Sequence, residues 1–117
     1  MIDDNLRVEL TELTASVCRA LNDPKRLMIL YALGDTRRSV GDLCELLDLS
    51  QSNVSQHLAV LRDSGVVDSS RDANRVIYSL RDQRVLQAID LLRNVMNDEV
   101  ARRHALGTRR RVRGAPR

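Results

Sequence analysis

Residues 50–57 form a run of mostly short hydrogen-bonding side chains, with the sequence Ser-Gln-Ser-Asn-Val-Ser-Gln-His. The amides of Gln and Asn can each form two hydrogen bonds with an adenine edge, and Ser and His can contact bases or phosphates. Val54 and Leu58 fall on the opposite face of a helix, where they would dock it against a core. The pattern therefore predicts a helix over residues 50–62 that presents its polar face to the major groove of DNA.

Further candidate contacts lie around the predicted turn of a β-hairpin. Arg71 and Arg75 flank this turn and are expected to contact phosphate or the minor groove, with Asn74 at the tip. The candidate DNA contacts are Ser50, Gln51, Ser52, Asn53, Ser55, Gln56, His57, Arg62, Arg71, Asn74 and Arg75. A polar helix face can also be simply solvated, so the prediction depends on the elements that surround it.

Three helices are predicted ahead of this segment. Apolar residues recur every three or four positions over residues 5–21, which indicates one amphipathic helix. Asp23 and Pro24 suit the N-cap and the first position of a second helix, which runs to about Leu33 and is apolar on almost every side. Such a helix belongs at the centre of a small domain. A third, short helix is expected from Ser39 to about Leu49.

The short helix and residues 50–62 are so close in the sequence that they predict a helix-turn-helix. After Gly65, β-branched and aromatic residues on either side of residues 72–74 predict a two-stranded hairpin, or wing. From Asp82 a last helix is expected to continue to about His104. The predicted fold class is mainly α with a small β-hairpin: a winged helix-turn-helix with five helices and a two-stranded wing.

The two end helices carry apolar stripes that a small domain has little surface to cover. A homodimer joined through the first and last helices would cover both stripes. The alternative is that each helix folds back on its own domain. In either case the expected organisation is one DNA-binding and dimerisation domain over residues 1–104, followed by a disordered arginine-rich tail over residues 105–117.

The net charge of +3 is unevenly distributed along the chain. Residues 101–117 contribute +7 and residues 1–100 contribute −4, so the basic balance comes from the tail. The tail could grip DNA phosphates, act as a solubilising segment or fold against the acidic N-terminus. No apolar run approaches the roughly eighteen residues of a membrane span, and the N-terminus is acidic, so a cytoplasmic protein is expected.

Two segments of the sequence resemble those of a known protein family. They are Asn-Asp-Pro-Lys-Arg-Leu at residues 22–27 and Leu-Ser-Gln-Ser-Asn-Val-Ser-Gln-His-Leu at residues 49–58, supported by residues 39–43, 61–67 and 76–80. The chain resembles the ArsR/SmtB repressors over roughly residues 13–96. The resemblance implies a winged-helix homodimer that binds an inverted-repeat operator in double-stranded DNA and leaves it when an inducer binds.

The resemblance also implies where inducer sites would lie, and most of their ligands are missing. Many relatives open the third helix with Cys-Val-Cys or Cys-Val-Gly, whereas this chain has Ser-Val-Gly at residues 39–41. Cys44 falls where some arsenic-responsive relatives place a cysteine. A zinc site on the last helix would need an Asp-x-His, where this chain has Asp82-Gln83-Arg84. Arg84 therefore argues against that zinc site.

Two weaker sensor sites remain open from the residues alone. Cys18 and Cys44 could form a thiol sensor, although buried cysteine commonly acts as a small hydrophobic residue. Asp98, Glu99 and His104 could form a nitrogen- and oxygen-ligated metal site, or a solvated helix end. No cofactor is required, and an inducer could be a metal, a metalloid or a redox signal.

The predicted function is sequence-specific transcriptional regulation, most simply by repression. The alternative is a winged-helix module for protein interaction and dimerisation that has no operator. The Ser, Asn and Gln face disfavours it, because protein interfaces rely on aromatic and aliphatic anchors, and this chain has two Tyr and no Phe or Trp. An enzyme is not expected, because the sequence has neither a Gly-rich phosphate loop nor a nucleophile paired with a base.

Overall fold

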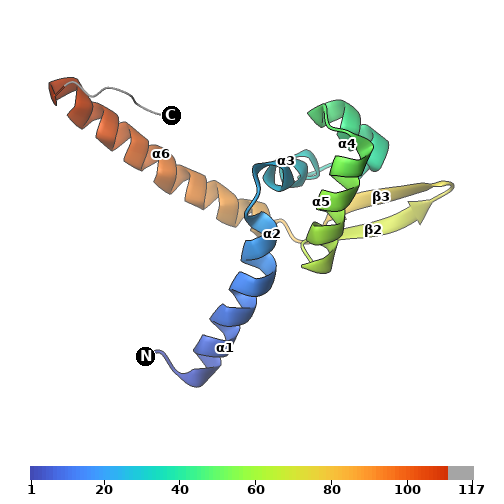
Figure 1. Ribbon diagram of the computed structural model, residues 1–117, viewed down its shortest axis with the longest axis horizontal. Helices are drawn as coiled ribbons and strands as arrows, with labels where there is room; N and C mark the ends of the chain where they lie inside the picture. The colour runs from blue at the N-terminus through green and yellow to red at the C-terminus, as the bar shows by residue number, and fades with distance from the viewer. Residues whose placement is uncertain (111–117) are drawn as a thin grey trace. The chain divides into compact units, whose positions relative to one another are not determined.

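The computed structural model describes residues 1–110 and the side chains of residues 1–106 (Figure 1). It divides into two compact units, Met1–Gln83 and a second that begins at Arg84. The predicted grouping of residues 1–104 into one domain therefore stays a prediction. No helix in the described part of the chain is both long and apolar enough to cross a membrane.

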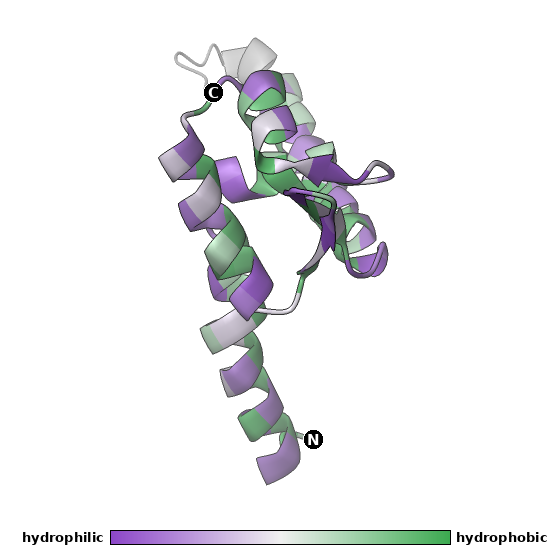
Figure 2. Cartoon of the chain, turned by 90° about the vertical axis from the view of Figure 1, so that its right-hand side faces the viewer, coloured by the Kyte–Doolittle hydropathy of each residue, from purple (hydrophilic) through white to green (hydrophobic). Residues whose placement is uncertain are grey.

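The N-terminal helix consists of three consecutive segments: α1 (Asp4–Leu13), a π-helical turn η1 (Thr14–Cys18) and α2 (Arg19–Leu21). Asp3 caps its start by accepting a hydrogen bond from the backbone N–H of Leu6 at 2.9 Å. Bands of apolar and polar residues alternate along α1 near the N-terminus (Figure 2). The predicted helix over residues 5–21 is thus present, with a π-helical turn that the apolar spacing does not signal.

Helix α3 (Pro24–Ala32) forms the centre of the first unit. Asp23 caps it, because its carboxylate accepts hydrogen bonds from the backbone N–H groups of Lys25 and Arg26. Ile29 and Leu30 have no exposed surface, which agrees with the central position predicted for this segment.

Helices α4 (Val40–Leu47) and α5 (Gln51–Asp63) form the helix-turn-helix. Ser39 and Asp42 make a reciprocal capping box at the start of α4, and Asp48 ends this helix in the left-handed conformation, with φ of 57°. The core beneath the two helices contains fully buried side chains from both: Leu43, Val54, Leu58 and Leu61.

The sheet has three strands, in the order β1-β3-β2, where the sequence predicted two. Strands β2 (Val67–Asp72) and β3 (Arg75–Leu80) form the predicted wing, which projects beside α5 (Figure 1). The additional strand β1 (Arg38–Ser39) pairs with the other edge of β3. A strand of two residues is too short to produce an alternating pattern, so the sequence gives no sign of it.

Helix α6 (Arg84–Arg110) is longer than predicted. It extends six residues beyond His104, through residues 105–110, and disorder of the tail stays a prediction. Residues 111–117 of the predicted tail lie outside the described residues. Many apolar side chains of α6 are more than half exposed: Leu91, Leu92, Val95, Met96 and Val100.

Candidate nucleic-acid interface

Helix α5 separates its polar and apolar residues onto opposite faces. Val54, Leu58 and Leu61 are buried, whereas the polar residues between them are exposed or half-buried. The predicted contacts that lie exposed on this helix are Gln51, Ser52, Ser55, Gln56 and Arg62. Asn53 is half-buried. The arrangement leaves amide and hydroxyl groups free to meet the edges of bases.

Ser50 has a structural task at the start of α5. Its hydroxyl oxygen accepts a hydrogen bond from the backbone N–H of Asn53 at 3.2 Å, which makes it the N-cap. The hydroxyl of Ser52 lies 3.4 Å from the same oxygen. Ser50 therefore fixes where the helix begins, besides being a predicted DNA contact.

His57 is half-buried and faces the α2–α3 junction. Its Nδ1 lies 3.2 Å from a terminal nitrogen of Arg26. Nearby, some desolvation of the Asp23 carboxyl opposes ionisation, but hydrogen bonds from the backbone N–H groups of Lys25 and Arg26 outweigh it and lower the pKa of Asp23. Local sequence patterns do not predict the contact between Arg26 and His57, because the two residues lie 31 positions apart.

On the wing, Arg71 and Asn74 are exposed, and Arg75 is held in an ion pair. A terminal nitrogen of Arg75 lies 3.1 Å from a carboxylate oxygen of Asp42. The hydrogen bond from the backbone N–H of Ser39 is the main reason why the pKa of Asp42 is lowered, and Arg75 adds to it. Asp42, which helps to cap α4, thus also holds a residue beside the turn of the wing.

Arg37 is a basic residue of this surface that sequence reasoning missed. It is exposed just before β1, and its guanidinium donates a hydrogen bond to the hydroxyl of Ser70 on β2 at 3.2 Å. The position of Arg37 beside the wing depends on β1, which the sequence pattern does not reveal. The one feature of the sequence that could have drawn attention to Arg37 is that it forms a basic pair with Arg38.

The candidate sensor residues are not gathered into a metal site. Among the residues that the structure describes, no group of three or more His, Cys, Asp or Glu could hold a metal ion. Cys18 is exposed on η1 and Cys44 is half-buried on α4, and both are free thiols. The carboxylate of Glu99 is bound by Arg102 at 2.6 Å and Arg103 at 3.1 Å, so it pairs with arginine instead of joining His104 in a ligand set.

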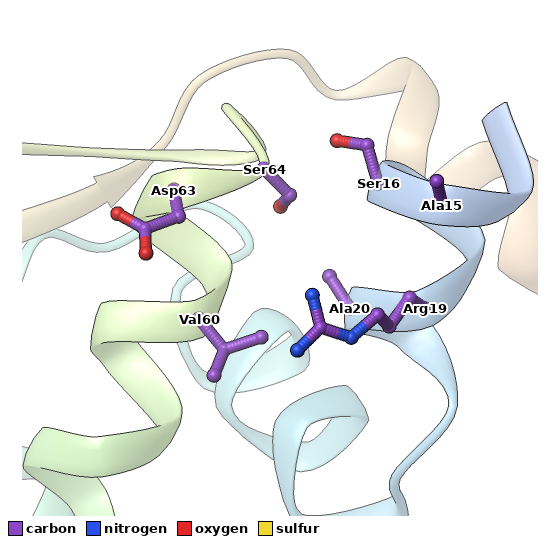
Figure 3. Close-up of a pocket in the computed structure, with 7 residues that line it drawn as sticks. All are labelled: Ala15, Ser16, Arg19, Ala20, Val60, Asp63 and Ser64. Carbon is purple, nitrogen blue, oxygen red and sulfur yellow. The ribbon is translucent and has the colours of Figure 1, made fainter. Parts of the chain in front are cut away.

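A pocket of about 220 Å³ lies between the N-terminal helix and the end of α5 (Figure 3). The side chain of Arg19 extends into it from α2, and Val60 points into it from α5. The remaining lining residues are Ala15, Ser16, Ala20, Asp63 and Ser64. The pocket therefore brings side chains of the N-terminal helix close to those of α5.

The element order, the polar face of α5 and the adjacent wing define a winged helix-turn-helix protein. The family model described as "Bacterial regulatory protein, arsR family" matches residues 23–69. The chain is 45% identical over 85 residues to the HTH-type transcriptional regulator YgaV of Escherichia coli. The matched region covers 72% of this chain and 86% of YgaV. The chain belongs to the ArsR family, and it is a DNA-binding transcriptional regulator, not an enzyme.

Solved structures of other proteins share this fold. The crystal structure of Rv0081 from Mycobacterium tuberculosis is 37% identical with a TM-score of 0.72, covering 80% of this chain and 95% of that one. The structure of reduced HlyU from Vibrio cholerae is 35% identical with a TM-score of 0.69, covering 80% of this chain and 97% of HlyU.

Proposed function

We propose that this protein is a homodimeric repressor that binds an inverted-repeat operator and leaves it when an inducer binds. The observation that carries the proposal is the exposed amide and hydroxyl face of α5, directly opposite the buried face that holds the helix in the fold. A helix anchored in this way can enter the major groove without rearranging its own domain.

The proposed contacts fall into two groups. Gln51, Asn53 and Gln56 contact base edges, because their amides can form paired hydrogen bonds. The other residues contact phosphates, the minor groove or neighbouring bases: Ser50, Ser52, Ser55, His57, Arg62, Arg71, Asn74 and Arg75. For Arg75 this means that a phosphate competes with Asp42 for its guanidinium.

The proposed dimer is supported by apolar surface on both end helices. Val8, Leu10 and Leu13 on α1 are between 42% and 58% exposed. On α6, five large apolar side chains from Leu91 to Val100 are between 56% and 66% exposed. Apolar surface of this extent is costly in water, and an isologous interface with a second copy would cover both stripes.

The two cysteines indicate the chemical class of the proposed inducer. The free thiols of Cys18 and Cys44 are compatible with a redox or metalloid signal, and Cys18 is the more accessible of the two. The described residues offer no three-ligand metal site within one chain. We therefore expect arsenite or a thiol oxidant to be a better inducer than zinc or nickel.

The test begins by selecting an operator from a random DNA pool with the wild-type protein, followed by fluorescence anisotropy. Replacing Gln51, Asn53 and Gln56 together by alanine should reduce operator binding to the level of scrambled DNA. The expected loss exceeds about a hundredfold, since each paired amide contact contributes roughly 1–3 kcal/mol of discrimination.

The matched control replaces two exposed amides of α6, Gln87→Ala and Asn94→Ala, and should leave operator binding unchanged. Analytical ultracentrifugation should find both variants in the same oligomeric state as the wild type. If the triple variant keeps its preference for the selected operator, the assignment of α5 is wrong. If the wild type selects no sequence at all, the protein-interaction alternative is favoured.

A further inference from the structure

One guanidinium group, that of Arg26 on α3, connects three parts of the first unit. Its Nε donates to the backbone carbonyl of Ala20 at 2.6 Å, and a terminal nitrogen donates to the carbonyl of Arg19 at 3.2 Å. The other terminal nitrogen lies 3.2 Å from Nδ1 of His57 on α5. Arg26 thus contacts the end of the N-terminal helix and the middle of the proposed DNA-contacting helix at the same time.

The two carbonyls belong to α2, the last segment of the N-terminal helix. Carbonyl groups in the last turn of a helix lack partners within the helix and need other donors. The carbonyl of Arg19 also accepts a hydrogen bond from the backbone N–H of Asn22 at 3.2 Å. Asp23 begins the next helix only two residues after α2 ends at Leu21, so the chain turns sharply here. Arg26 therefore fixes this junction from the first turn of α3.

The contact with His57 defines the protonation of its ring. A guanidinium group has donors and no acceptor, so Nδ1 must accept the hydrogen bond. The neutral ring then carries its proton on Nε2. His57 lies one turn after Asn53 and adjacent to Gln56, so a restraint on its ring also restrains the rotation of α5 about its axis.

We propose that Arg26 is a positioning residue for DNA binding, which holds α5 through Nδ1 of His57 so that the amides of α5 are aimed at the groove. The inference rests on the proposed function of α5. Arginine suits this task because its planar fork carries five donors in fixed directions, whereas a lysine ammonium on a flexible chain cannot reproduce contacts with all three acceptors. Side chains that recognise a ligand need hydrogen bonds from neighbouring residues to stay within a fraction of an ångström of their binding geometry.

The first test uses Arg26→Lys, which keeps the charge, in three backgrounds at about pH 8, where imidazole is largely neutral. In the wild-type background it should weaken operator binding about tenfold, the size expected for one hydrogen bond that involves a charged group. In a His57→Asn background the loss should persist, because the Asn oxygen can replace Nδ1 as the acceptor. In a His57→Gln background the acceptor at that position is missing, and the loss should shrink several-fold.

Comparing losses between backgrounds removes any direct contact of position 57 with DNA, because both members of each pair carry the same residue there. Urea denaturation should show that the variants remain folded at the assay temperature. Equal losses in all three backgrounds would mean that Arg26 supports only the end of α2, and would overturn the proposal. No loss in the wild-type background would overturn it as well.

A second measurement needs no DNA. Long-range ¹H–¹⁵N NMR of the imidazole rings should show neutral His57 with its proton on Nε2, and its Nδ1 signal should change in Arg26→Lys. A proton on Nδ1 would exclude the contact. Failure of the wild type to bind any operator would contradict the proposed function and leave this NMR result unaffected, so the two failures are distinguishable.

Discussion

Ala73 adopts a backbone conformation that L-residues rarely take. It is the first of the two residues between the paired positions Asp72 and Arg75, and its φ is 59°. A positive φ at this position is common to the type I′ and type II′ turns of two-residue hairpins, and it favours glycine, which has no Cβ. The wing tip therefore carries local strain that a single substitution can relieve.

We expect Ala73→Gly to raise the free energy of unfolding by about 0.5–1 kcal/mol, since the strain of a left-handed alanine exceeds the entropic cost of glycine. The matched control is Ala59→Gly on the exposed side of α5, where glycine should lower the free energy of unfolding by about 1 kcal/mol. Urea denaturation checks both variants. A decrease for Ala73→Gly would contradict the proposed turn strain.

The limits of sequence reasoning are also visible in single residues. The exposed polar side chains and the buried apolar side chains of α5 could be assigned from the sequence because helical spacing places them on opposite faces. The roles of Arg26 and Arg37 could not be assigned from the sequence. Their partners, His57 and Ser70, lie 31 and 33 positions away, and local periodicity contains no information about such contacts.

Among the structural elements, those with strong local signals were predicted and those without them were missed. The boundaries of α3, α4 and α5 follow from Asp23, Ser39 and Ser50, each of which is an N-cap in the structure. Strand β1 forms only because β3 lies beside it. The helical continuation over residues 105–110 was missed because the absence of an apolar stripe indicated a tail, although alanine, leucine and arginine favour helices.

The capping box of α4 predicts a specific response to acid. The pKa of Asp42 is lowered in the folded protein, chiefly by the hydrogen bond from the backbone N–H of Ser39. A carboxyl group whose pKa is lower in the folded than in the unfolded state stabilises the fold at pH values above its pKa in the unfolded state. That stabilisation is lost as the pH falls through the pKa of the group in the folded state.

We therefore expect Asp42→Asn to lower the urea midpoint near neutral pH, with a difference from wild type that shrinks below about pH 4. The variant loses the ionised cap and the ion pair with Arg75, whereas the wild type loses them only on acidification. Asp98→Asn, on the exposed surface of α6, is the control for the change in net charge. A difference from wild type that stays constant from neutral to acid pH would argue against the ionised cap.

For the whole molecule, the central question is what covers the apolar surface of α6. Leu92 is 66% exposed and Met96 is 57% exposed, and the two lie four positions apart on one face of the helix. Replacing both by lysine would place two like charges in the proposed isologous interface, where each copy would meet the same change in its partner. The wild type should sediment as a dimer and the double variant as a monomer at the same concentration.

Loss of the dimer should weaken operator binding by more than about a hundredfold, because the second half-site is then no longer held at a high effective concentration. Binding of the double variant to a single half-site should be nearly unchanged, since α5 and the wing belong to the first unit and carry neither substitution. Asn94→Lys, an exposed polar position on α6, tests whether charge alone has this effect. A double variant that remains dimeric would show that α6 is not the dimer interface, and the apolar stripe would then need another occupant.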